Sequence, residues 1–227
     1  MKEEAKSLWD NEIANDDQIK AVVFSSAKES GFIAGADIGD IRSIDDKQEL
    51  IPIIKDGLEF FKKMKSKGIP LVSAIHGPAL GGGLEWALWC DYRICSDSPK
   101  TKLGLPEVKL GLLPGKYESA SNCVILHDIS FVTDISTTFY RKGFGGTQNL
   151  HPLIGLQEAL PMMLQGKEVR SKKAKKIGLV DMIVASQSLE QVAIDSALAL
   201  ADGTLKKNKV SLTMMIALSS ICTSNAQ

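Results

Sequence analysis

The stretch ALGGGLEWAL, residues 79–88, decides the fold, because it places three consecutive glycines and a glutamate at the start of an apolar helix. Glycine in a helix interior costs about 1 kcal/mol relative to alanine. Glycine also lets a ligand approach the backbone closely, and the first-turn amides of a helix lack intrahelical acceptors. The run therefore indicates a place where exposed amides are needed.

The glycine run does not match two common phosphate-binding motifs. A P-loop needs Lys and then Ser or Thr after its last glycine, but Leu84 and Glu85 follow here. A dinucleotide-binding fingerprint that starts at Gly81 needs a glycine where Trp86 stands. Two interpretations remain: an oxyanion hole, in which amides bind an oxygen that gains negative charge, or a close helix–strand crossing without a ligand.

Two further segments favour the oxyanion hole. FIAGADI (32–38) carries small side chains around Gly35, so its backbone can supply a second amide donor. Glu85 lies one turn into the helix, and Glu107 has apolar neighbours in LGLPEVKLG (103–111). A carboxyl group in apolar surroundings has a raised pKa and can hold a proton to donate. The two glutamates could divide acid and base roles, although each taken singly is more often a surface residue.

The rest of the chain predicts an α/β fold, because strand-like and helix-like segments alternate. Buried strands are expected at 19–26, 69–77, 91–96 and 178–184. Helices are expected at 2–14, 47–67, from the glycines to about 90, 156–165, 171–177 and 188–201.

Composition excludes several classes of protein. The 227 residues suit one domain, or one domain with a short appendage. The formal net charge is zero, so no overall field attracts nucleic acid or an anionic membrane. No apolar run reaches the roughly 18 residues of a transmembrane helix. Four cysteines lack zinc-ligand spacing and any CxxC pair, and are expected to be reduced thiols of an intracellular protein: Cys90, Cys95, Cys123 and Cys222.

Four motifs in order carry a resemblance to a known family: FIAGADI, HGPALGGGLE, PEVKLGLLPG and GFGGTQ. Over roughly residues 1–205 the chain resembles the enoyl-CoA hydratase/isomerase (crotonase) family. The segments around CDYRI and MMLQGKEVRSKKAKKIGLVD most resemble hydratase domains of mitochondrial trifunctional-enzyme α subunits. The resemblance implies a crotonase-like spiral of ββα units and a mitochondrial location, although MKEEAKSLWDNEIAND does not read as a targeting peptide.

The resemblance also implies a site. The amides of Ala36 and Gly82 form the oxyanion hole for a thioester carbonyl, Glu85 acts as base on water, and Glu107 gives a proton to Cα. Neither a metal nor a redox cofactor is expected, since coenzyme A is part of the substrate. The substrate-binding positions implied are Ala34, Ala36, Asp37, Ile38, Gly82 and Pro106.

The implied reaction is hydration of trans-2-enoyl-CoA to 3-hydroxyacyl-CoA in fatty-acid β-oxidation. Two alternatives remain: a Δ3-Δ2-enoyl-CoA isomerase, which needs one well-placed carboxylate, and a non-catalytic truncated fragment that binds acyl-CoA. The expected partners are an acyl-CoA substrate and either further copies of the chain or, at full length, a thiolase-type β subunit. Nucleic acid is not expected as a partner.

The chain also departs from the family pattern. By comparison with the family, the N-terminal strand pair and the C-terminal helices are expected to be incomplete, and residues 206–227 are expected to form a divergent tail. Residues 116–143 interrupt the domain of residues 1–205, as either a translated intron or a lineage-specific surface loop. The basic stretch KEVRSKKAKK (167–176) either meets the phosphates of coenzyme A or is a solvated helix face.

Overall fold

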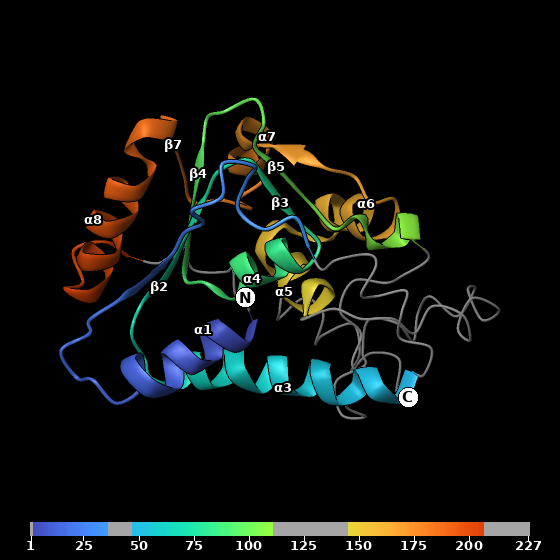
Figure 1. Ribbon diagram of the computed structural model, residues 1–227. Coiled ribbons are helices and arrows are strands. Elements are labelled where there is room, and N and C mark those ends of the chain that lie inside the picture. Colours follow the sequence, from blue (N-terminus) through green and yellow to red (C-terminus); the bar gives the residue numbers. More distant parts are fainter. Residues whose placement is uncertain (1, 36–46, 111–144, 207–227) are drawn as a thin grey trace, which may run out of the picture.

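The computed structural model describes residues 2–35, 47–110 and 145–206, which build two sheets flanked by helices (Figure 1). The first sheet is fully parallel and has the strand order β1-β2-β4-β7. The second sheet has the order β3-β5-β6, and its central strand β5 runs parallel to β3 and antiparallel to β6. The strands are β1 (Val22–Phe24), β2 (Leu71–Ile75), β3 (Pro78–Leu80), β4 (Tyr92–Ser96), β5 (Lys102–Gly104), β6 (Val169–Arg170) and β7 (Met182–Val184).

Helices enclose both faces of the parallel sheet. In Figure 1, α8 lies along one side, while α1 and α3 run below the strands and α4 to α7 gather on the other side. The helices are α1 (Lys2–Leu8), the π-helical turn η1 (Trp9–Ile13), α3 (Lys47–Ser66), α4 (Gly82–Trp89), α5 (Gly146–Ile154), α6 (Leu156–Leu164), α7 (Ser171–Lys176) and α8 (Leu189–Ala201), with 3-10 turns η2 (Pro106–Leu110) and η4 (Ser186–Ser188).

Strand β2 is buried along its whole length because helices cover both of its faces. Val72 and Ala74 point to α8, as the period of two requires. Leu71 points the other way, into the core cluster that contains Trp9 and residues of α3. A continuous apolar run, and not an alternating one, is typical of a strand in this position.

A buried ion pair ties β4 to the residues before β7. Asp181 Oδ2 lies 3.0 Å from Nη2 of Arg93 and accepts the Arg93 amide at 2.8 Å. The guanidinium also donates to the carbonyls of Cys90 and Leu179. Both charges are therefore satisfied inside the core.

The expected helices and strands are confirmed in type, and most of the observed elements are shorter. Strands β3, β5 and β6 were not expected, because strands of two or three residues are too short to show a hydrophobic period. Cys90 and Cys95 are buried free thiols, as expected, and burial raises the pKa of each to about 12. Residues 116–143 and 207–227, with Cys123 and Cys222, lie outside the described residues.

Candidate active site

Gly81 makes the turn from β3 into α4. Its φ of 55° and ψ of −126° lie in a region that residues with a Cβ rarely adopt. Its amide donates to the carbonyl of Gly104 in β5 at 2.9 Å, which fixes the turn against the second sheet. Gly82 then opens α4, so its amide is one of the first-turn donors without an intrahelical acceptor.

The segment before residue 36 packs directly against this turn. The amide of Ile33 donates to the Pro78 carbonyl at 3.2 Å, and the Leu80 amide donates to the Ile33 carbonyl at 3.0 Å. A Cβ on Gly83 would lie 2.0 Å from the Ile33 oxygen, so a glycine is required there. The glycine run therefore has two roles: Gly83 lets the Ile33 segment pack closely against α4, and Gly82 offers a first-turn amide. Ala34 is exposed beside it.

Glu85 lies in the first turn of α4 and is 1% exposed. Its Oε1 accepts a 2.8 Å hydrogen bond from the amide of Gly146, the first residue of α5. A Cβ on Gly146 would lie 2.8 Å from the same oxygen and 3.3 Å from Cδ1 of the buried Leu105. A helix N-terminus and a backbone amide both stabilise negative charge, so this contact suits a carboxylate.

Glu107, the second residue of η2, is 9% exposed and faces the glycine turn. A Cβ on Gly81 would lie 2.8 Å from its Oε1. Its Oε2 is buried and has no hydrogen-bond partner among the described residues. Burial, and then the nearby charge of Glu85, raise the pKa of Glu107 to about 8. This carboxyl group therefore keeps its proton at neutral pH.

The structure thus brings Gly82, Glu85 and Glu107 to one place, with Pro106 directly before Glu107 at the start of η2. Two carboxyl groups whose environments differ in this way are suited to separate acid and base roles. The other expected site residues lie outside the described residues: Ala36, Asp37 and Ile38.

Sequence reasoning missed two residues of this site, Gly146 and Leu105. Gly146 donates its amide to Glu85, and Leu105 packs against Gly146 beside that contact. The signal for Gly146 was present, because GFGGTQ also places glycine at the start of a helix. The contact with Glu85 could not be predicted, because 61 positions separate the two residues in the chain.

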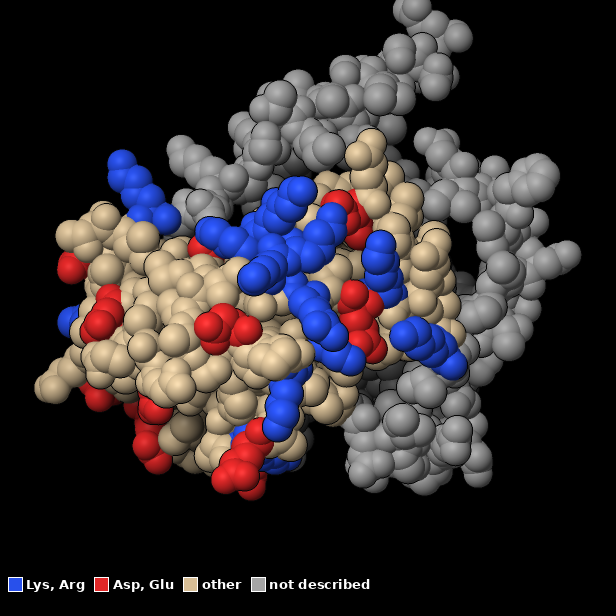
Figure 2. All heavy atoms as spheres, turned by 90° about the horizontal axis from the view of Figure 1, so that it is seen from above, with Lys and Arg blue, Asp and Glu red and all other residues tan. Residues whose placement is uncertain are grey.

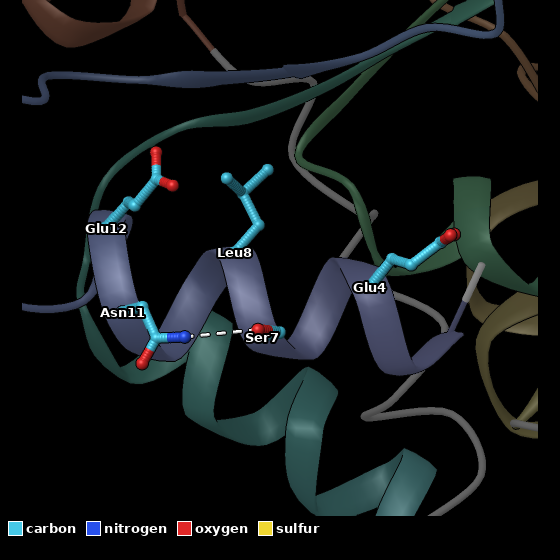
Figure 3. Close-up of a pocket in the computed structure, with 5 residues that line it drawn as sticks. All are labelled: Glu4, Ser7, Leu8, Asn11 and Glu12. Atoms are coloured by element: carbon cyan, nitrogen blue, oxygen red, sulfur yellow. Dashed lines mark hydrogen bonds between the residues drawn. The ribbon is translucent and has the colours of Figure 1, made fainter.

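Two surface depressions among the described residues lie elsewhere. One, of about 480 Å³, is lined by Glu4, Ser7, Leu8, Asn11 and Glu12, and Figure 3 shows Asn11 donating to Ser7 within the helix. The other, of about 370 Å³, lies where β1, β2, β4 and β7 end, and is rich in serine. Neither contains the glutamate pair. Within the described ranges no three His, Cys, Asp or Glu residues gather as metal ligands would.

Sequence comparison finds relatives of this chain. The model of the family "Enoyl-CoA hydratase/isomerase" matches residues 2–123. The fatty acid oxidation complex subunit alpha of Idiomarina loihiensis is 41% identical over 196 residues, which are 86% of this chain and 24% of that protein. The protein of the same name from Vibrio campbellii is 43% identical over 175 residues, 77% of this chain and 21% of that protein. The chain thus spans under a quarter of these relatives' length.

Solved structures agree in fold. The enoyl-CoA hydratase of Bacillus anthracis superposes with a TM-score of 0.68 at 26% identity, over 99% of this chain and 71% of that one. DspI of Pseudomonas aeruginosa gives 0.67 at 30% identity, over 86% and 63%. A crotonase fold is therefore confirmed.

The comparisons also correct one expectation. The relatives described above come from bacteria, which lack mitochondria, so the expected mitochondrial location is wrong. Likeness to mitochondrial trifunctional enzymes had suggested it, and the relatives carry the name of a fatty acid oxidation complex instead. The described helices include none that is long and apolar enough to cross a membrane. Because the family model matches more than half of this chain, the chain belongs to the enoyl-CoA hydratase/isomerase family.

Proposed function

We propose that this chain is an enoyl-CoA hydratase, which adds water to trans-2-enoyl-CoA to give 3-hydroxyacyl-CoA in fatty-acid β-oxidation. The observation that carries the proposal is the pairing of two buried carboxyl groups in unlike settings. Glu85 accepts the Gly146 amide, whereas Glu107 is desolvated and has no partner for Oε2 among the described residues. The names of the relatives and of the family model support it.

In the proposed reaction, Glu85 takes a proton from water as the water oxygen bonds to C3 of the substrate. The electron pair of the double bond moves toward the thioester carbonyl, whose oxygen gains negative charge. The amide of Gly82 stabilises that oxygen, and Ala36 is proposed as the second donor. Glu107 then transfers its proton to C2. Loss of one such amide donor costs about 10²–10³ in rate.

This scheme uses two proton transfers and two amides, and we propose that it needs neither a metal nor a redox cofactor. Ala34, Asp37, Ile38 and Pro106 are proposed to line the substrate. Gly35 and Glu107, which follow Ala34 and Pro106 in the chain, both lie against the Gly81 turn.

The test is to compare Glu85→Gln and Glu107→Gln in an assay of trans-2-enoyl-CoA hydration. Glu168→Gln, on a half-exposed carboxylate, is the matched control. Each site variant should lose at least about a hundredfold in kcat, while the control stays near wild type. If both site variants retain a kcat within about threefold of wild type, the proposed roles are contradicted. Turnover of a 3-enoyl-CoA that needs only one of the glutamates identifies an isomerase instead.

We further propose that the chain works in an assembly, either with further copies of itself or, within a longer subunit, with a thiolase-type β subunit. The relatives are named as subunits of a fatty acid oxidation complex, which supports this. Light scattering of the purified chain, alone and with a candidate β subunit, measures the mass of the assembly and so tests this proposal.

A further inference from the structure

Cations gather on one face of this electrically neutral chain. Figure 2 looks onto that face and shows Lys and Arg side chains fanned across it with few acidic ones between them. We name as the basic face the cationic residues of β5, η2, β6 and α7 together with Lys167, two positions before β6: Lys102, Lys109, Lys167, Arg170, Lys172, Lys173, Lys175 and Lys176.

Contacts between these elements show that the residues share one surface. Lys102 and Arg170 are direct partners across the β5–β6 pair. Lys102 and Lys109 both approach the carboxylate of Glu168, at 3.5 and 3.9 Å. Helix α7 begins immediately after β6, and its buried residues Ser171 and Ala174 turn its lysines outward.

The charges on this face are only partly neutralised. Glu168 serves two lysines, and Glu158 pairs with Lys173. Five members are exposed and have no ion-pair partner among the described residues, although one of them, Lys175, donates to the backbone carbonyl of Asp181: Lys167, Arg170, Lys172, Lys175 and Lys176. On the opposite side of the molecule three lysines of α1 and α3 are paired: Lys6 with Asp56, Lys63 with Asp10 at 2.6 Å and Lys65 with Asp91 at 2.7 Å.

Several like charges stand at positions where they repel each other. Two cations that face each other directly across a strand pair, as Lys102 and Arg170 do, destabilise the pair. Lysines three and four positions apart on a helix do the same, as with Lys172 and Lys176. An anionic surface that binds here relieves this repulsion, whereas a merely solvated face leaves it in place.

The composition of the face selects among anionic partners. It has seven lysines and one arginine and no aromatic side chain. Lysine is depleted in protein–protein interfaces, and binding of single-stranded nucleic acid relies on aromatic stacking. The lysine ammonium groups are point charges on flexible side chains, which suits them to a fluid layer of phosphate headgroups. Clusters of four to eight Lys or Arg are typical of anionic-lipid binding. We propose that the basic face docks this chain on anionic phospholipid membranes.

The experiment measures co-sedimentation of the purified chain with vesicles of phosphatidylcholine alone and of phosphatidylcholine with phosphatidylglycerol. The test variant is Lys167→Gln/Lys172→Gln/Lys176→Gln. Its matched control is Lys20→Gln/Lys62→Gln/Lys206→Gln, which removes three exposed lysines of other segments. Thermal melts followed by circular dichroism establish that both triple variants fold.

We expect binding to the mixed vesicles alone, and loss of binding at high salt because the charges are exposed. The test variant should bind about a hundredfold more weakly, since each lysine near an anionic surface contributes about fivefold. The control should change by about twofold or less. Equal loss in both variants, or equal binding to neutral vesicles, overturns the proposal. So does displacement by equimolar free coenzyme A, which assigns the face to nucleotide phosphates, or by double-stranded DNA at equal phosphate concentration, which assigns it to nucleic acid. These results do not depend on hydratase activity.

Discussion

The backbone amide of Gly146 donates a 2.8 Å hydrogen bond to Oε1 of Glu85, although 61 positions separate the two residues. The glutamate belongs to the first turn of α4, and the glycine opens α5. The proposed base is therefore held by the N-terminus of a second helix. A side chain at residue 146 has no room beside that oxygen.

Gly146→Ala should displace the Glu85 carboxylate, because the new Cβ would lie 2.8 Å from Oε1. Misplacement of a catalytic group by about 1 Å can cost on the order of a hundredfold in rate. We expect kcat for enoyl-CoA hydration to fall to that extent. The control is Gln148→Ala, an exposed position of the same helix. If Gly146→Ala retains wild-type kcat, the amide contact does not position the base.

Glu107 should give hydration an alkaline limit. Its protonated form is the proposed acid, and its pKa is raised to about 8, so kcat/KM should fall as pH rises through about 8. Initial rates at subsaturating enoyl-CoA from pH 6 to pH 10 measure this. A flat profile across that range contradicts the assignment of Glu107 as the acid.

Glu107→Gln should become more stable than wild type as pH rises. The folded pKa of about 8 lies above the ordinary 4.5, so the folded state binds a proton that the unfolded state releases between these values. The contribution of Glu107 to stability is thus fully present below about pH 4.5 and is lost as pH rises to about 8, by about 1.4 kcal/mol per pH unit at most. Urea titrations of both proteins at pH 5 and pH 8.5 test this. An equal difference at the two pH values shows that Glu107 is not buried as a neutral group.

Gly83→Ala and Gly82→Ala form a matched pair within α4. A Cβ on Gly83 would lie 2.0 Å from the Ile33 carbonyl, whereas a Cβ on Gly82 meets nothing within 4 Å. Gly83→Ala should lower the free energy of unfolding by about 1–3 kcal/mol, through overpacking, and abolish activity. Gly82→Ala should fold normally, because alanine favours a helix by about 1 kcal/mol. Thermal melts rank the two variants, and equal melting temperatures contradict this account of the crossing.

Asp181→Asn should destabilise the chain without touching the proposed chemistry. It leaves the buried Arg93 charge without its ion-pair partner, which typically costs about 3–5 kcal/mol. The double variant Arg93→Met/Asp181→Leu is the control, because removal of both charges avoids the unpaired one. A double variant less stable than Asp181→Asn contradicts this explanation.

Much of this structure could be predicted from sequence, for identifiable reasons. The run IKAVVFSS predicts β1, and the amphipathic pattern predicts α3 closely, because long periodic segments carry their own signal. Gly82 and Glu85 stood out because glycine and charge are unusual at the start of an apolar helix. The Gly146 partner of Glu85 could not be predicted, since tertiary packing and not local periodicity brings it there. Likewise β5 and β6 carry no hydrophobic period of their own and form by pairing, β5 with β3 and β6 with β5.

Both sheets are completed by strands from the far end of the chain: β7 pairs with β4, and β6 pairs with β5. Residues 2–110 therefore supply both glutamates and one edge strand of each sheet, β1 and β3, while residues 145–206 supply the opposite edge strands, β7 and β6, and the amide of Gly146. The molecule is divided as a split enzyme is divided, into two pieces that each lack what the other holds. Expressed as separate polypeptides, the two pieces should be inactive alone and should regain hydratase activity when mixed. Activity would then report that the two pieces have reassembled.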